Sequence, residues 1–204
     1  MESGSEGGLS RRRFLARAGG VTAATAGVVP FSVVGQSSAG TNWPMRRGDA
    51  ANTGTHSGVA PTDSIEKRWQ FRVSGSPLTE ATVVGKTVYV GGGNSVYALS
   101  AATGERRWRF RTGDSVRTAP TVQDGTVYVG STDSNVYTLS AADGSEQWSA
   151  QLGLSILAAP VPVGDTVYVG GRNGQVCALN GATGAERWVF STDDPIYASP
   201  AVVD

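Results

Sequence analysis

The chain has 204 residues, which is enough for one medium-sized domain with its own hydrophobic core. Its 17 basic and 17 acidic residues cancel to a formal charge of zero, so we expect no nucleic-acid partner, because such proteins usually carry an excess of basic residues. Charged residues make up only 17% of the chain and it has 28 glycines, a composition that favours a turn-rich all-β protein.

Residues 1–39 are predicted to be a leader that directs export. They contain most of a twin-arginine motif, which is carried by Arg11, Arg12, Phe14 and Leu15. The run from Ala16 to Val34 is too polar for a convincing membrane span, and Ser37-Ser-Ala39 suits a signal-peptide cleavage site. We therefore expect a secreted, periplasmic or cell-surface protein with no stable membrane span after cleavage. A basic amphipathic helix that stays on the chain is the alternative.

Residues 40–66 form an irregular lead-in with many turn-forming residues and few strand signals. His56 is the only histidine of the chain, and no second histidine or nearby cysteine could complete a metal site with it. We expect His56 to be an exposed loop residue and Trp43 to be a packing anchor. No metal site is predicted.

From residue 67 onward the chain repeats itself with a period of about forty residues. Four tryptophans mark the repeat, with spacings of 39, 40 and 40 residues: Trp69, Trp108, Trp148 and Trp188. A Thr-Val-Tyr-Val run recurs in the same phase and begins at Thr87, Thr126 and Thr166. A regular period of this length indicates a repeat architecture in which each copy is one supersecondary unit.

One copy of the repeat reads as four short strands separated by turn residues. In the second copy, the turn at Asp124-Gly125 is a hairpin signal, and Thr126-Val-Tyr-Val129 is rich in β-branched and aromatic residues. The predicted strands of this copy are 117–122, 126–129, 135–139 and 146–150. Four antiparallel strands joined by tight turns make the blade of a β-propeller.

The repeat phase predicts three whole blades, at about 78–111, 117–151 and 157–191. Lys67–Val73 matches the outer strand of a blade, and Tyr197–Val203 matches the inner strand of another. The predicted fold is therefore an all-β, incomplete β-propeller of four-stranded antiparallel blades within residues 67–204.

The segment before each of the last three tryptophans resembles the repeat of PQQ-type (quinoprotein-type) propellers. That family's tryptophan-docking motif is Ala-x-Asp-x-x-Thr-Gly-x-x-x-Trp, and this chain departs from it at Ser100, Ser140 and Asn180, which can still accept the local turn hydrogen bond. The resemblance implies that each tryptophan stacks on a Thr-Gly or Asp-Gly turn of a neighbouring blade. The residues expected in this docking are Trp69, Gly104, Trp108, Gly144, Trp148, Gly184 and Trp188.

The resemblance implies two kinds of function. Outer-membrane assembly factors use these blades, without PQQ, as scaffolds for partner polypeptides, and on this analogy we expect an exported scaffold that binds other exported proteins. Quinoprotein dehydrogenases bind PQQ with Ca²⁺ on the propeller axis. We expect those cofactors only if the chain is a fragment of such an enzyme, because no cluster of carboxylates suggests a calcium cage. No catalytic residue is predicted, and Cys177 is explained as a packing residue at the repeat position of Tyr97 and Tyr137.

Three blades and two stray strands would leave sheet edges open at both ends. We therefore expect a fragment of a longer product, with self-association through the open edges and a decayed gene as alternatives. The loop Leu152–Leu157 is apolar and is a candidate partner surface, whereas Asp193-Asp194 is interpreted as a solvated turn.

Overall fold

The computed structural model describes residues 43–45, 66–73, 78–153 and 155–202. The predicted leader, with Arg11, Arg12, Phe14 and Leu15, lies outside the described residues, as does His56. Within the described ranges the chain forms twelve strands and no helix, so these residues offer no helical segment that could cross a membrane.

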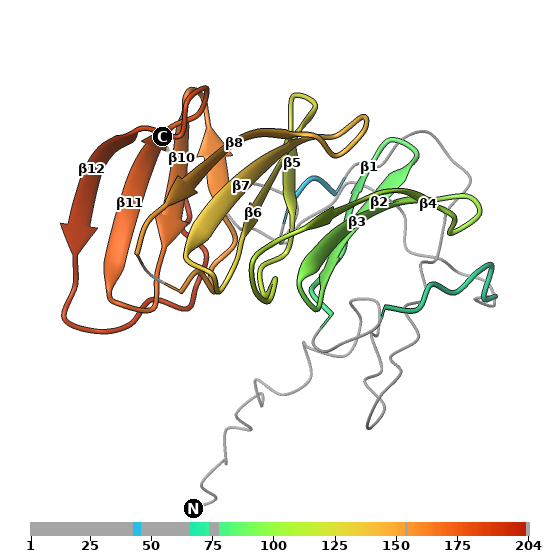
Figure 1. Cartoon of the computed structure of the whole chain (residues 1–204), viewed down its shortest axis with the longest axis horizontal. Helices are drawn as coiled ribbons and strands as arrows, with labels where there is room; N and C mark the ends of the chain where they lie inside the picture. Colours follow the sequence, from blue (N-terminus) through green and yellow to red (C-terminus); the bar gives the residue numbers. More distant parts are fainter. Residues whose placement is uncertain (1–42, 46–65, 74–77, 154, 203–204) are drawn as a thin grey trace, which may run out of the picture.

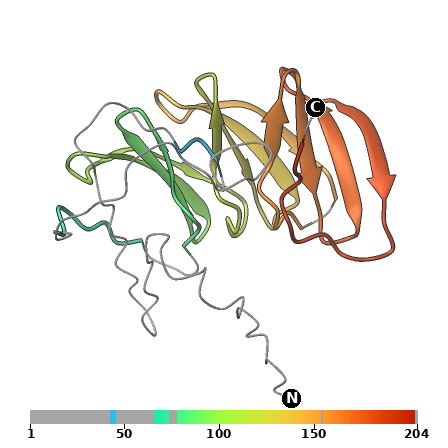
Figure 2. The same ribbon diagram turned by 180° about the vertical axis from the view of Figure 1, so that it is seen from behind.

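The twelve strands form three four-stranded sheets that stand side by side (Figures 1 and 2). Blade 1 contains β1 (Thr82–Val84), β2 (Thr87–Gly92), β3 (Ser95–Ser100) and β4 (Arg106–Arg111). Blade 2 contains β5 (Thr121–Gln123), β6 (Thr126–Gly130), β7 (Asn135–Ser140) and β8 (Glu146–Gln151). Blade 3 contains β9 (Val161–Val163), β10 (Thr166–Gly170), β11 (Gln175–Asn180) and β12 (Glu186–Ser191). Consecutive strands pair antiparallel, so the predicted incomplete β-propeller is confirmed.

The second strand of each blade forms the centre of the core. Val88, Val127 and Val167 are fully buried, because the second strand has a sheet neighbour on each side and its faces are covered by other blades or, in the case of Val88, by the segment 66–73. Such double burial selects a run of β-branched and aromatic residues rather than an alternating pattern. The hairpin into β6 turns at Asp124 and Gly125, both of which have positive φ as a type I′ turn requires.

The linkers between blades are hydrogen-bonded on both sides. In the first linker, the Val116 N–H donates to the Gly93 carbonyl of blade 1 at 2.8 Å, and the Ser115 carbonyl accepts from Thr132 N–H of blade 2 at 2.9 Å. A Cβ at Gly91 would lie 2.6 Å from the Val116 side chain, so the glycine leaves room for the linker. The linkers therefore fix the spacing between neighbouring blades.

The lead-in contributes a short segment at the inner edge of the blades. Trp43 exchanges two backbone hydrogen bonds with Val83 of β1, at 2.6 and 2.9 Å, and the Pro44 carbonyl accepts from Val122 N–H of β5 at 2.6 Å. Met45 is buried. This segment therefore spans the innermost strands of blades 1 and 2 (Figure 1).

Two predicted strands do not form. Residues 66–73 join none of the three sheets, although Phe71 makes an isolated bridge, and residues 197–202 have no regular structure. The inner strands of the three blades each pair with a second strand of their own blade, and the residues that the structure describes contain no such strand beside residues 197–202. The predicted strand at 117–122 is also shorter than expected, because its first residues belong to the linker and only Thr121–Gln123 pairs with β6.

Candidate functional site

The rings of three of the four repeat tryptophans pack against the blade that follows them in the chain. Each indole Nε1 donates to a backbone carbonyl in the turn between the third and fourth strands of that blade. The pairs are Trp69 with Ala101 at 2.9 Å, Trp108 with Ala141 at 3.0 Å, and Trp148 with Gly181 at 3.0 Å. The ring of each tryptophan covers the glycine of the same turn, namely Gly104, Gly144 and Gly184.

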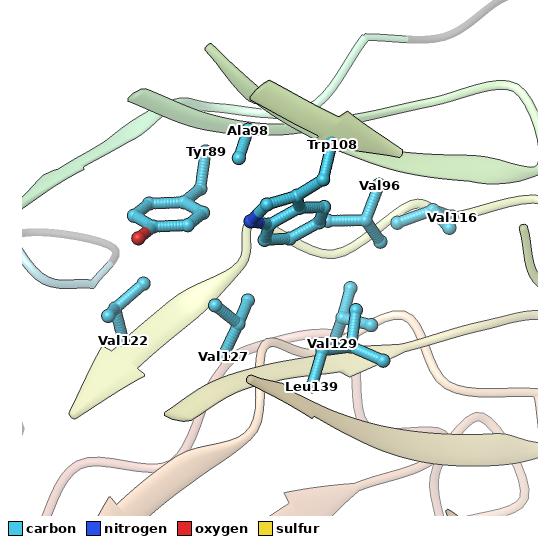
Figure 3. Close-up of a cluster of buried hydrophobic side chains, with 9 residues drawn as sticks. All are labelled: Tyr89, Val96, Ala98, Trp108, Val116, Val122, Val127, Val129 and Leu139. Carbon is cyan, nitrogen blue, oxygen red and sulfur yellow. The ribbon is translucent and has the colours of Figure 1, made fainter. Parts of the chain in front are cut away.

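Figure 3 shows the buried side chains that surround the ring of Trp108. The Trp108 ring lies between side chains of blade 1, such as Tyr89, and side chains of blade 2, such as Val127 and Leu139, in one buried cluster. Only 7% of Trp108 is exposed. Burial of this ring joins the two sheets, since aromatic side chains contribute large buried areas to a core.

Ser100, Ser140 and Asn180, which replace the aspartate of the family motif, still stabilise the turn, but through different hydrogen bonds. Asn180 accepts hydrogen bonds from the Ala182 N–H at 2.9 Å and the Thr183 N–H at 3.1 Å through its Oδ1. The Ser100 hydroxyl accepts from the Thr103 N–H at 3.3 Å. In all three turns a backbone bond from the glycine N–H to the carbonyl at the departing position is 2.8 Å long, including the one at Ser140.

Trp188 does not dock, and the prediction of a fourth docked tryptophan is wrong in this respect. The side chain is 46% exposed because no further blade lies beyond β12 among the described residues. Its nearest ring is Tyr168 of its own blade, at 6.0 Å between centroids. Phe190 of the same strand is 61% exposed, and Tyr197, which follows the last strand, is 57% exposed. Blade 3 thus presents an apolar aromatic surface.

The described residues around blade 1 are basic, whereas those around blades 2 and 3 are acidic, with the larger part of the negative charge around blade 2. Residues 66–111, which include blade 1, have eight basic and three acidic side chains, a formal charge of +5. Residues 112–202, which include blades 2 and 3, have three basic and nine acidic side chains, a formal charge of −6. A chain with no net charge is therefore strongly polarised along the row of blades, a feature that its total composition hides.

Asp133 links a turn of blade 2 to the linker that enters it. Its carboxylate accepts from the Gly113 N–H at 2.7 Å, the Asn135 N–H at 2.9 Å and the Tyr137 hydroxyl at 2.8 Å. Burial alone would raise the pKa of Asp133, but these donors outweigh it and lower the pKa. Burial and the bond to Asp133 raise the pKa of Tyr137 to about 12. These perturbed groups serve the architecture, since each is matched by a structural hydrogen bond.

The inner ends of the three blades surround a hollow of about 420 Å³. It is lined by Leu78, Thr79, Glu80, Arg117, Thr118, Ala119, Leu157, Ala159 and Ser199. Several of the polar groups are already bonded to the backbone: the Thr118 hydroxyl bonds to Gly130, and the Ser199 hydroxyl accepts from the Ala159 N–H at 3.0 Å. The charged groups at this hollow are Glu80 and Arg117, both exposed.

Sequence reasoning missed Glu80 and Arg117. A signal was present, because the repeat places leucine at 78 and 157 where blade 2 has Arg117, and alanine at 119 and 159 where blade 1 has Glu80. A charged residue at one copy of an otherwise apolar repeat position is what a site on a repeat scaffold would show.

The residues at this hollow do not match PQQ and Ca²⁺. PQQ is a flat, multiply anionic quinone, and the lining offers one guanidinium and no aromatic ring. Calcium takes six to eight oxygen ligands, usually with several carboxylates. The described residues contain no group of three or more His, Cys, Asp or Glu side chains that could hold a metal ion. The blades described here therefore do not by themselves supply a quinoprotein site.

Two other predicted features can be placed. Cys177 is buried in the core between blades 2 and 3, and burial raises the pKa of its thiol, so it is a packing residue. In the loop Leu152–Leu157, which was expected to be an exposed apolar surface, the described apolar side chains are largely packed inward. Ile156 is fully buried against Gly130, Leu152 packs on the same core, and Leu157 lines the hollow.

A family model described as outer membrane protein assembly factor BamB matches residues 57–204. No curated protein matches the chain in sequence.

Among solved structures, the chain is similar to BamB from Moraxella catarrhalis, with 24% identity and a TM-score of 0.59 over 67% of this chain and 44% of that one. It is similar to a europium-containing methanol dehydrogenase, with 25% identity and a TM-score of 0.61 over 76% of this chain and 32% of that one. A quinohemoprotein alcohol dehydrogenase from Pseudomonas putida has 28% identity and a TM-score of 0.52 over 56% of this chain and 20% of that one. The alignments thus cover less than half of each of these proteins.

Proposed function

The chain belongs to the PQQ-type propeller family whose model is described as outer membrane protein assembly factor BamB, and from this premise we propose that it is a scaffold that binds other polypeptides outside the cytoplasm. The observation that carries the proposal is the lining of the hollow at the inner ends of the blades. It combines apolar side chains, small hydroxyls and one charge of each sign.

Such a lining suits an extended polypeptide segment. Leu78 and Leu157 offer apolar contacts to alternate side chains of a peptide, while Arg117 and Glu80 can bind its charged groups. Among the described residues, no strand pairs with the inner edges of β5 and β9, and Val122 of β5 donates one hydrogen bond there, to the Pro44 carbonyl. A flat anionic cofactor would use few of these groups.

The predicted leader supports a location outside the cytoplasm. The twin-arginine residues Arg11 and Arg12 and the run that follows them favour export, and the matching family model is described as an outer membrane protein assembly factor. Binding of a polypeptide partner would then take place after export.

A photoreactive phenylalanine analogue placed at Leu157 tests the proposal. We expect it to form covalent adducts with other exported polypeptides in cells, and we expect Arg117→Ala in the same chain to weaken them. The matched control is the same analogue at Ala142, an exposed turn residue on the outer side of blade 2, which should give none. Equal labelling from both positions, or none from Leu157, would remove the proposal.

The second candidate is a segment of a PQQ-dependent dehydrogenase, favoured by the similarity to the methanol and alcohol dehydrogenases. When bound, PQQ supplies the two-electron redox chemistry of such enzymes. This candidate predicts that a longer product, whose further blades add the cofactor ligands that the described residues lack, reduces a dye with an alcohol as electron donor when it is given PQQ and Ca²⁺. Reduction of the dye, without adducts at Leu157, would favour it over the scaffold.

A further inference from the structure

Positive charge is concentrated on one blade and, within that blade, on one strand. Blade 1 (residues 82–111) has five basic side chains and one acidic one, blade 2 (residues 121–151) has four acidic and no basic ones, and blade 3 (residues 161–191) has two of each. Four of the basic side chains of blade 1 belong to its outer strand, β4: Arg106, Arg107, Arg109 and Arg111. The repeat does not require them, because the same positions of β8 carry one glutamate and no basic residue.

The exposure of these arginines follows from the place of β4 in its blade. All four are exposed, and so are the corresponding side chains of β8, whose blade packs against a blade on each side. Among the described residues, no strand pairs with the outer edge of β4 or of β8, so backbone N–H and C=O groups are free along both edges. Since β8 has the same kind of edge with a single charged residue, protection of an edge from aggregation does not require four arginines.

Two of the arginines are held in place by uncharged groups. Arg109 donates from Nε to the Ser95 hydroxyl at 3.0 Å, and its guanidinium carbon lies 5.5 Å from the centre of the Tyr97 ring. Arg111 lies beside the side chain of Asn94, whose oxygen, in the amide orientation that satisfies both groups, accepts from its Nε at 3.1 Å and its Nη2 at 3.2 Å. These contacts direct both side chains, but they do not neutralise the charge, and they leave further N–H groups for an anion.

Blade 3 shows how the same repeat position looks when its arginine serves the fold. There Arg187 forms an ion pair with Asp165, with 2.6 Å between Nη2 and Oδ2. Arg107 occupies the position of Arg187 in blade 1, and Lys86 replaces the aspartate. Arg107 therefore donates to two uncharged groups, the Lys86 carbonyl at 3.1 Å and the Thr87 hydroxyl at 2.9 Å. The sequence of blade 1 thus gathers like charges, which an anionic ligand would stabilise.

The geometry of the strand sets the spacing of the charges on such a ligand. Side chains alternate along a strand, so Arg109 and Arg111 project from one face of β4 and lie about 7 Å apart along it. Phe110, between them, projects from the other face, where its ring lies 5.3 Å from that of Tyr137. A strand added to the outer edge of β4 would have the same period, and its alternate side chains would lie beside the two arginines. Acidic side chains at those positions would pair with both.

We propose that the outer edge of β4 binds an extended segment of another polypeptide in which acidic side chains occupy alternate positions. The segment adds a fifth strand to blade 1: backbone hydrogen bonds to the free edge hold it, and Arg109 and Arg111 select its acidic residues. Arg106 and Arg107 extend the positive surface to the beginning of the strand. This surface is separate from the hollow at the inner ends of the blades, so the result of either test leaves the other proposal standing.

A labelled synthetic peptide in which glutamate alternates with threonine tests the inference, with fluorescence anisotropy as the measurement. We expect its dissociation constant to rise at least about fivefold in the double variant Arg109→Gln and Arg111→Gln, since two charge pairs are lost. The matched control is Arg172→Gln with Arg187→Gln, which removes the same charge from exposed positions of blade 3 and should leave the affinity unchanged. Circular dichroism checks that both variants keep their fold.

Two further measurements separate an added strand from general attraction of anions. Hydrogen exchange of the β4 amides should slow when the peptide is added, and a peptide of the same composition with its glutamates in one block should bind more weakly. Vesicles of phosphatidylglycerol present negative charge without a polypeptide backbone. Binding to these vesicles but not to the alternating peptide would overturn the inference in favour of a membrane surface. Equal peptide binding by the wild type and both double variants, or unchanged exchange at β4, would overturn it as well.

Discussion

The turn glycines show how a single residue decides whether two blades can meet. Gly104, Gly144 and Gly184 each have φ between 71° and 76°, a conformation that side-chain-bearing residues adopt at a cost. Each also lies under an indole, so a Cβ there would meet a tryptophan ring at 2.5 to 2.7 Å. Two separate physical demands therefore select glycine at the same position of the repeat.

The two demands can be measured separately. Gly125 has the same φ of 76° as Gly144, but a Cβ there would meet nothing within 4 Å. We expect Gly125→Ala to cost about 1–2 kcal/mol of unfolding free energy through its backbone alone. Gly144→Ala should cost clearly more, because the Trp108 ring must also move. Urea denaturation of both variants checks this, and equal losses would show that Trp108 does not constrain the turn.

For single residues, the sequence predicted a structural role where the residue recurs in every repeat, and it predicted none where the residue occurs in one repeat only. The tryptophan and glycine positions followed from a motif present in three copies, and three of these tryptophans lie over turn glycines of adjacent blades. Glu80 and Arg117 each occur in one copy, and only the structure brings them to one hollow. A repeat reveals what its copies share, which is chiefly the scaffold.

At the scale of elements, a strand forms only where another strand completes its ladder. The twelve strands of the three blades were predicted in the right order, since turn signals and β-branched runs mark each of them. Residues 66–73 and 197–202 have strand-like sequences as well, yet they join no sheet. The sequence pattern shows that a segment is able to form a β-strand. Whether the strand forms also depends on a second strand that lies beside it and accepts its backbone hydrogen bonds.

The tryptophans give an internal comparison between covered and uncovered blades. Trp108→Ala should lower the free energy of unfolding by roughly 3–5 kcal/mol, because it empties a buried site between two sheets. Trp188→Ala should change it by less than about 0.5 kcal/mol, as is usual for exposed positions. The measurement is thermal unfolding at protein concentrations too low for association. A loss at Trp188 as large as that at Trp108 would contradict the assignment of the end surface.

The described part of the molecule is a row of three blades whose inner ends line one hollow, and the proposed binding role follows from that form. The hollow along the inner ends of the blades is the proposed site for a polypeptide segment. The repeat period and the family motif made the propeller predictable. The separation of the basic residues around blade 1 from the acidic residues around blades 2 and 3 could be recognised only when the positions of the blades were known.

The central claim is that this propeller works outside the cytoplasm, and the most direct test is the intact mass of the protein in each cell fraction. We expect the bulk of the chain outside the cytoplasm with residues 1–39 removed, and we expect Arg11→Lys together with Arg12→Lys to hold it in the cytoplasm with its leader attached. A wild-type chain that stays in the cytoplasm with its leader uncleaved would contradict the claim.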